Sequence, residues 1–343
     1  MPASPKALLG PILKGVSRSF HKTLRVLPGK IRSQIGLAYL LARTTDTVAD
    51  TNLLPVDRRL EALKQLRQRI AGVGQAPIEF GELALKQSSS AERILLENCE
   101  QALVLLERMS GSDRQLIQQV LEIITSGQEL DLRRFGSASA AAIVALRTDA
   151  ELDDYTYRVA GCVGEFWTRI CRSHLFPAAE LDDTFLLSNG VRFGKGLQLV
   201  NILRDVPSDL RIGRCYLPSE RLAQAGLNPS DLLRPENEPR LRPLYNSYLD
   251  LSKAHLLAGW EYTKALPRGQ LRVRLACAWP ILIGLETLKL LRRENVLNVL
   301  NPERPIKITR QAVKKIIRRS IMLYPFRGAW DSLANKAAPR NRD

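Results

Sequence analysis

The stretches YLLARTTDTVAD (residues 39–50) and LQLVNILRDVPSDLRIGRCYLP (residues 197–218) each contain two aspartates four residues apart. On an α-helix this spacing places both carboxylates on one face, where like charges repel each other. Its occurrence on two otherwise apolar segments suggests that a cation binds between the carboxylates. Mg²⁺ holding a diphosphate is the natural candidate, because this ion takes carboxylate and phosphate oxygens together. The alternative is that each pair is a solvated helix face or a helix cap.

In the first stretch, Tyr39, Arg43, Asp46 and Asp50 follow one another at steps of four, three and four residues. They therefore share one narrow stripe of the predicted helix. Unpaired charge is costly in an apolar core. The stripe is thus better suited to lining a polar pocket.

The second stretch repeats this design with Gln198, Asn201, Asp205 and Asp209 at steps of three, four and four. Pro207 lies between the two aspartates. A proline inside a helix removes a backbone hydrogen bond and disfavours helical geometry at the preceding residue. We therefore expect a kink or a helix end at Pro207, which would move Asp209 relative to Asp205.

The chain as a whole is predicted to be an all-α protein with a single domain over residues 1–343. It has 343 residues, of which 45% are hydrophobic, and leucine, alanine, arginine, glutamine and glutamate recur at helical spacing. We predict loops at 72–90 and 219–239. The expected helices lie near 30–50, 56–71, 91–109, 112–132, 149–173, 182–210, 240–265, 272–293 and 309–322.

No stretch reaches the roughly 18 to 20 apolar residues that span a bilayer. The nearest, Leu275–Leu285, contains Pro280. The first residues, MPASPKALLGPILKG, have prolines where a signal peptide needs a continuous apolar run. With no CxxC among five cysteines, zinc and disulfide sites are not expected. We predict a cytoplasmic protein without a transmembrane segment.

The net charge of +16 is concentrated near the C-terminus, where fourteen Lys or Arg accompany four Asp or Glu from Lys289 onward. Such a segment could bind nucleic acid, lie on an anionic membrane, or be a solvated basic helix. Within ITRQAVKKIIRRSIML (residues 308–323), an apolar face opposes a basic one. The apolar face comprises Val313, Ile316, Ile317 and Ile321; the basic face comprises Lys314, Lys315, Arg318 and Arg319. This helix could contact a membrane surface or dock on the core.

Four motifs together resemble the squalene and phytoene synthase family of head-to-head prenyl synthases. They are SRSF (17–20), YLLARTTDTVAD (39–50), YTYRVAGCVGEF (155–166) and the stretch 197–218. The resemblance covers about residues 15–315 and leaves 316–343 as a basic tail. It implies a class I isoprenoid synthase fold, a helical bundle around a central cavity with the two aspartate motifs at its mouth.

The resemblance also implies roles for individual residues. Magnesium would be bound by Asp46, Asp50, Asn201, Asp205 and Asp209. Substrate would be bound by Ser17, Arg18, Phe20, Arg43, Val163, Gly164, Gln198, Asn201, Arg204 and Arg214, and the reacting centre would include Tyr39 and Tyr155. A surface salt bridge would equally explain Arg204 or Arg214, and tight helix packing would explain Gly161 and Gly164. Pro207 departs from the family's usual second motif.

The implied reaction is the condensation of two farnesyl diphosphates to presqualene diphosphate, followed by reduction to squalene with NADPH. Lys307 and Arg310 would meet the NADPH phosphates. Phytoene, dehydrosqualene and presqualene diphosphate synthases are alternatives without the reductive step, and a non-catalytic relative is another. The expected partners are prenyl diphosphates and an anionic membrane surface. A basic helical protein that binds nucleic acid is disfavoured, because no aromatic residues interleave the basic tract.

Overall fold

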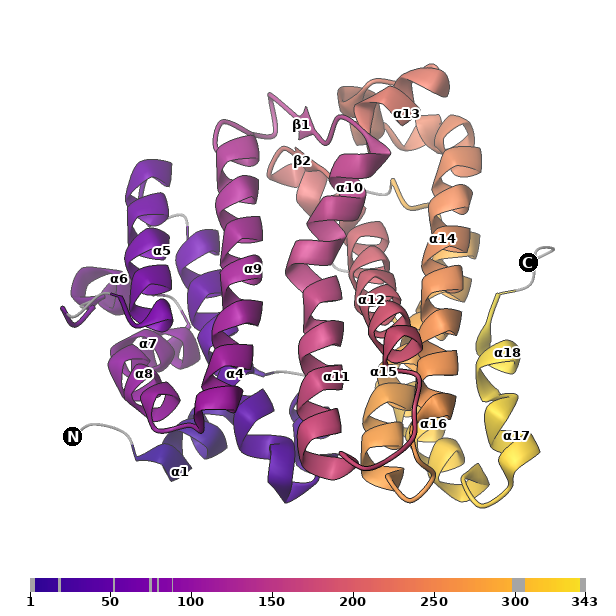
Figure 1. Cartoon of the computed structure of the whole chain (residues 1–343). Coiled ribbons are helices and arrows are strands. Elements are labelled where there is room, and N and C mark those ends of the chain that lie inside the picture. Colours follow the sequence, from indigo (N-terminus) through magenta and orange to yellow (C-terminus); the bar gives the residue numbers. More distant parts are fainter. Residues whose placement is uncertain are drawn as a thin grey trace. The chain divides into compact units, whose positions relative to one another are not determined.

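The computed structural model describes residues 4–17, 20–51, 53–73, 76–78, 80–87, 89–297 and 306–339. These residues are almost entirely helical, with one pair of two-residue strands (Figure 1). This confirms the all-α prediction. The chain divides into two compact units, residues 1–136 with 166–178, and residues 137–165 with 179–343.

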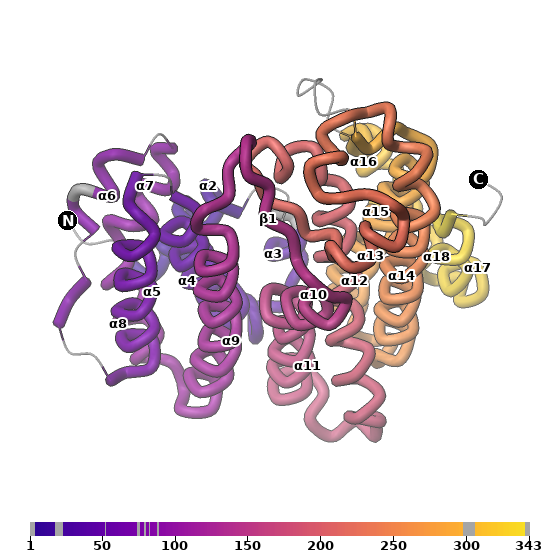
Figure 2. The backbone as a smooth tube through the Cα atoms, turned by 90° about the horizontal axis from the view of Figure 1, so that it is seen from above, coloured from indigo at the N-terminus to yellow at the C-terminus, as the bar shows by residue number. Residues whose placement is uncertain are grey.

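Unit 1 is organised around α4 (Gly29–Asp50), whose apolar face is buried. Helix α4 packs against α5 (Val56–Ala71), α8 (Cys99–Glu107) and α9 (Gly111–Phe135), and α4, α5 and α9 lie side by side in Figure 2. The remaining helices of this unit are α1 (Pro5–Ala7), η1 (Leu8–Ile12), α2 (Leu13–Val16), α3 (Phe20–Val26), α6 (Gly81–Lys86) and α7 (Ser90–Glu97).

Unit 2 is built on α12 (Asp183–Arg211), which packs along α14 (Glu238–Ala265); α14 in turn packs on α15 (Leu271–Arg293). Strands β1 (Val144–Ala145) and β2 (Arg214–Cys215) pair in parallel. The other helices that lie wholly in this unit are α10 (Asp149–Thr156), η2 (Tyr157–Gly161), α13 (Ser219–Gln224), η3 (Pro229–Leu233), η4 (Pro235–Asn237), α16 (Arg310–Leu323), α17 (Arg327–Asp331) and α18 (Leu333–Ala337). The division between the units falls inside α11 (Cys162–Leu175).

Glycines allow two helices of unit 2 to cross closely. A Cβ atom on Gly164 would lie 1.9 Å from the carbonyl oxygen of Gly190, and one on Gly194 would lie 2.1 Å from that of Ala160. No side chain fits at such distances, so glycine is required here. The tight packing that we considered for Gly164 is therefore real.

Helix α12 continues past Pro207 to Arg211, so of the two alternatives expected at this proline, a kink or a helix end, the helix end is wrong. Proline has no N–H to donate to the carbonyl of Leu203, four residues earlier. The hydroxyl of Tyr245 on α14 donates to that carbonyl instead, at 2.8 Å, and Tyr245 is fully buried. The missing helix bond is thus replaced from a neighbouring helix.

The predicted loops and tail contain more helix than expected. The stretch 72–90 includes α6, and 219–239 includes α13, η3 and η4. Residues 316–339 form the end of α16 followed by α17 and α18 rather than a tail; Trp330 is buried there, stacked on Trp260 at 4.6 Å between ring centroids. None of the helices described is long and apolar enough to cross a membrane.

Candidate functional site

In unit 1, the aspartates of the first motif lie at the end of α4, with Arg43 one turn before them. Arg43 forms an ion pair with Asp46 and donates a 2.6 Å hydrogen bond to Glu92 on α7. Asp50 is exposed at the last position of the helix. Two carboxylates thus contact a single guanidinium, and a third, Asp50, lies one turn beyond Asp46.

The electrostatics of this cluster favour an additional cation. Burial and the charge of Asp50 raise the pKa of Asp46 from 3.8 to about 6, against the opposing influence of Arg43, and Glu92 adds to the rise. Carboxylates that disfavour one another's ionisation are stabilised by a cation that neutralises them. The side chain of Asp46 keeps 39% of its surface accessible, so it can be reached.

Tyr39 connects α4 to the SRSF motif. Its hydroxyl is 3.5 Å from the carbonyl oxygen of Val16, the last residue of α2. Ser17 is 1% exposed, and its hydroxyl is a buried polar atom with no hydrogen-bond partner among the described residues. Arg18 and the side chain of Phe20, also predicted to bind substrate, lie outside the described residues.

In unit 2, the second motif repeats the pairing of arginine with aspartate. Arg204 donates two hydrogen bonds to Asp205, from Nε at 2.8 Å and Nη2 at 2.5 Å. That bond to Asp205 is the main reason the pKa of Arg204 is raised, and the charge of Asp209 one turn later contributes. The salt bridge that we considered for Arg204 is present.

The two amide residues of the second motif precede Asp205 on α12, Asn201 by one turn and Gln198 by two. The side-chain amide of Asn201 donates to Oε1 of Gln198 at 3.4 Å, and Asn201 is exposed. The helix therefore presents an amide next to the carboxylates, as the spacing predicted.

Tyr155, on α10, stacks on Tyr216, with 4.7 Å between ring centroids. Tyr216 follows β2, the strand that contains Arg214. After α10 the chain forms the π-helical turn η2, a rare feature that occurs frequently at functional sites. Val163, two residues after this turn, is 37% exposed.

The donor set fits Mg²⁺ only in combination with a ligand. Among the described residues, no three His, Cys, Asp or Glu side chains converge as a metal site. Mg²⁺ commonly uses one or two carboxylates and takes its remaining oxygens from water and phosphate. Asp46 and Asp50 lie on one face of α4, and the accessible carboxylate of Asp46 has a raised pKa. Such a pair could bind Mg²⁺ that takes its other oxygens from phosphate and water.

The two residues predicted to contact NADPH lie at the start of α16. Arg310 is the first residue of α16, and Lys307 lies three residues before Arg310. Both side chains are exposed. The side chain of Thr309 caps this helix by accepting from the N–H of Ala312.

Three residues that the sequence analysis missed support these sites. Glu92 is 49 residues from Arg43 in the sequence, so no local pattern indicates their contact. Tyr245 is likewise far from Pro207, 38 residues later. Tyr216 lies within the CYLP end of the second motif and could have been singled out as an aromatic residue in a catalytic motif.

Comparison with known proteins relates the chain to one family. The profile of the squalene/phytoene synthase family matches residues 13–311. A presqualene diphosphate synthase of Rhodopseudomonas palustris is 30% identical over 250 residues, covering 73% of this chain and 76% of that protein. A bifunctional lycopene cyclase/phytoene synthase of Arthroderma gypseum is 28% identical over 240 residues, which are 70% of this chain but only 39% of that protein.

The fold is shared with solved structures. The complex of TcSQS with the ligand E5700 superimposes with a TM-score of 0.73 at 23% identity, covering 97% of both chains. The helical fold of terpenoid synthases, expected from the motifs, is thereby confirmed.

Proposed function

The chain belongs to the squalene/phytoene synthase family, and on that premise we propose that it condenses two farnesyl diphosphates head to head to give presqualene diphosphate. The observation that carries this proposal is the repeated arrangement on α4 and α12. On each helix, two aspartates lie one turn apart and an arginine is paired with the first of them. Each of the two helices thus offers a comparable set of groups for binding diphosphate with Mg²⁺.

The first chemical step is the heterolytic cleavage of an allylic C–O bond, with the electron pair leaving on diphosphate. Mg²⁺ bound at the aspartates would supply the positive charge that stabilises this leaving group. The chain's own contribution is Arg43 and Arg204, whose guanidinium groups suit phosphate oxygens, and the buried hydroxyl of Ser17.

The allylic cation is then attacked by the double bond of the second farnesyl diphosphate, and loss of a proton closes the cyclopropane ring. The face of an aromatic ring attracts a cation. Tyr155 and Tyr216, stacked on each other, are therefore placed as a pair that could stabilise it. We assign the proton to the departing diphosphate or to the hydroxyl of Tyr155.

A second candidate function is the subsequent reduction of presqualene diphosphate to squalene by hydride transfer from NADPH, with loss of diphosphate. The exposed Lys307 and Arg310 at the beginning of α16 favour it. Cationic side chains at a helix N-terminus are a suitable site for nucleotide phosphates.

Products formed from farnesyl diphosphate and Mg²⁺, with and without NADPH, test both proposals by mass spectrometry. Presqualene diphosphate without NADPH supports the condensation, and squalene formed only with NADPH supports the reduction. Arg310→Ala should then lower squalene while leaving presqualene diphosphate formation unchanged. Phytoene made from geranylgeranyl diphosphate, with farnesyl diphosphate left unused, would overturn the choice of substrate.

A further inference from the structure

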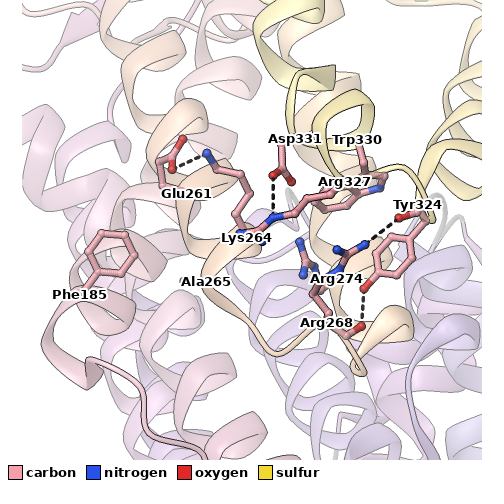
Figure 3. A pocket seen from close by; sticks show the side chains of 10 residues that line it. All are labelled: Phe185, Glu261, Lys264, Ala265, Arg268, Arg274, Tyr324, Arg327, Trp330 and Asp331. Carbon is pink, nitrogen blue, oxygen red and sulfur yellow. Dashed lines mark hydrogen bonds and ion pairs between the residues drawn. The ribbon is translucent and has the colours of Figure 1, made fainter.

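A pocket of about 320 Å³ lies in unit 2, at the end of α14 and the start of α15 and beside the turn between α16 and α17 (Figure 3). Its charged side chains give it an excess of two positive charges. They are Lys264, Arg268, Arg274 and Arg327 against Glu261 and Asp331. None of the residues assigned above to substrate, metal or nucleotide lines this pocket.

Two of the cations are neutralised locally. Lys264 pairs with Glu261 at 2.7 Å, and Arg327 lies 3.8 Å from Asp331. Arg268 has no carboxylate within ion-pair distance among the described residues; it is instead 3.4 Å from the carbonyl oxygen of Tyr324 (Figure 3). The uncompensated charge is therefore concentrated on Arg268 and Arg274.

Arg274 is the more unusual of these two residues. Its side chain lines the pocket although the residue is 4% exposed, and its Nε atom is buried without a hydrogen-bond partner in the described part of the chain. Among the described residues, its guanidinium donates one hydrogen bond, to the carbonyl of Leu266 at 3.3 Å. The guanidinium carbon lies 4.7 Å from the ring centroid of Trp330 and 5.5 Å from that of Tyr324.

Aromatic rings compensate a buried cation only in part, and a buried charge normally requires a counter-ion. Burial accordingly lowers the pKa of Arg274. A leucine or methionine would fill this position without that cost. Because burying an arginine here is energetically unfavourable, its presence suits a role in binding an anion.

We propose that the pocket binds a phosphate-bearing anion that supplies the counter-ion Arg274 lacks. Guanidinium groups bind phosphate oxygens through paired N–H donors. Arg268 and the exposed Arg327 provide such donors at the rim, while Phe185 adds an apolar wall. The site differs from the proposed nucleotide contact, because Arg310 and Tyr324 lie at opposite ends of α16, about 20 Å apart at 1.5 Å per residue.

The test is isothermal titration of the full chain with inorganic diphosphate in EDTA, which prevents Mg²⁺-dependent binding at the aspartates. We expect binding of one diphosphate, weakened at least tenfold in Arg268→Gln/Arg327→Gln. The matched control is Arg108→Gln/Arg114→Gln, which removes the same charge from one exposed and one half-buried position of unit 1, where Arg114 likewise donates to a carbonyl. This control should bind diphosphate like the unaltered protein.

A second variant, Arg274→Met, addresses the buried charge. It should lose diphosphate binding at least tenfold while its melting temperature stays equal or rises, because an uncompensated charge is removed. Conservative Arg274→Lys should retain part of the affinity.

Vesicles identify the source of the phosphate. If phosphatidylcholine vesicles containing phosphatidic acid displace diphosphate, and plain phosphatidylcholine vesicles do not, the ligand is a lipid headgroup. Diphosphate binding that such vesicles leave unchanged indicates a soluble phosphate compound. The proposal is overturned if neither probe binds, or if the pocket variant and the control variant bind alike. Because these titrations contain no Mg²⁺ and no turnover, they are independent of the proposed condensation.

Discussion

The same residue-level arrangement occurs on both helices, a carboxylate held by an arginine with a second carboxylate one turn further on. In α4 these are Arg43, Asp46 and Asp50. Burial and the charge of Asp50 raise the pKa of Asp46, so the ionised carboxylate is disfavoured where it lies. A carboxylate whose ionised form is unfavourable is what we expect of a residue that binds a cation, because the cation stabilises the ionised form.

We predict that Asp46→Asn and Asp205→Asn each lower the condensation rate by about 10²-fold or more, since each removes charge that stabilises the leaving group. Asp46→Asn should unfold at no lower temperature at pH 8, because asparagine mimics the protonated form that the fold favours. Steady-state kinetics and thermal melts measure the two effects.

Glu97→Gln is the control for these variants, because it removes a carboxylate from an exposed Arg93–Glu97 pair of α7. It should leave turnover unchanged. Near-normal turnover in either aspartate variant would contradict the assignment of the two pairs.

His255 gives a pH-dependent prediction. Burial lowers its pKa from 6.5 to about 4, the charges of Arg192 and Lys195 add to this, and Asp153 opposes it. Between pH 6.5 and 4 the unfolded chain therefore binds a proton that the folded chain does not, so the free energy of unfolding falls as the pH falls. His255→Gln should show a smaller drop in melting temperature between pH 7.5 and 5. An equal drop would contradict this explanation.

At the scale of elements, α12 depends on α14 for a hydrogen bond that Pro207 cannot make. Tyr245→Phe keeps the ring beside Arg242 but leaves the Leu203 carbonyl buried without a donor. We expect a loss of about 1–3 kcal/mol in the free energy of unfolding, measured in urea.

The same substitution in a Pro207→Ala background should cost much less, because the N–H of an alanine at position 207 can donate to that carbonyl. This double-mutant cycle isolates the hydrogen bond from other effects of the hydroxyl. Equal costs in the two backgrounds would show that Tyr245 acts independently of Pro207.

Helix α16 is docked on α15, and Ser320 is its buried residue, accepting a 3.0 Å hydrogen bond from Trp279. Val313, Ile316 and Ile317 are half-buried, whereas Ile321 and Met322 are 47% and 65% exposed. The helix thus contacts the core and retains apolar surface for a second partner. We propose that this partner is an anionic membrane.

Replacing Lys314, Lys315, Arg318 and Arg319 by alanine should reduce flotation with anionic liposomes at least tenfold, since each basic residue contributes about 1 kcal/mol near such a surface. Liposomes of neutral lipid provide the baseline. Unchanged flotation of the variant would rule out the role of α16.

At the scale of the whole molecule, the long helices were predictable because each is a long run of helix-forming residues bounded by residues that break helices. Helix α4 was expected at 30–50 and spans Gly29–Asp50, and the helix expected at 182–210 spans Asp183–Arg211. Short helices such as α6 and α13 contain too few turns to show a period. The helices after residue 323 were missed because Trp330 is stabilised by its stack on Trp260, a contact far away in sequence.

The two motifs were predictable from spacing within single helices, but their partners were not. Glu92 and Tyr245 act through tertiary contacts that no local pattern encodes, whereas Tyr216 lies within the second motif and only its stack on Tyr155 is a tertiary contact. The helix end expected at Pro207 was wrong for the same reason. A local rule about proline was overridden by a hydroxyl from another helix.

The central claim is that two farnesyl diphosphates are joined before any reduction takes place. The most direct measurement is the stoichiometry of diphosphate release with Mg²⁺ and without NADPH, together with the mass of the organic product. We expect one diphosphate to be released for every two farnesyl diphosphates consumed, and a C30 product that still carries a diphosphate. Release of one diphosphate per farnesyl diphosphate, with only C15 products, would contradict it.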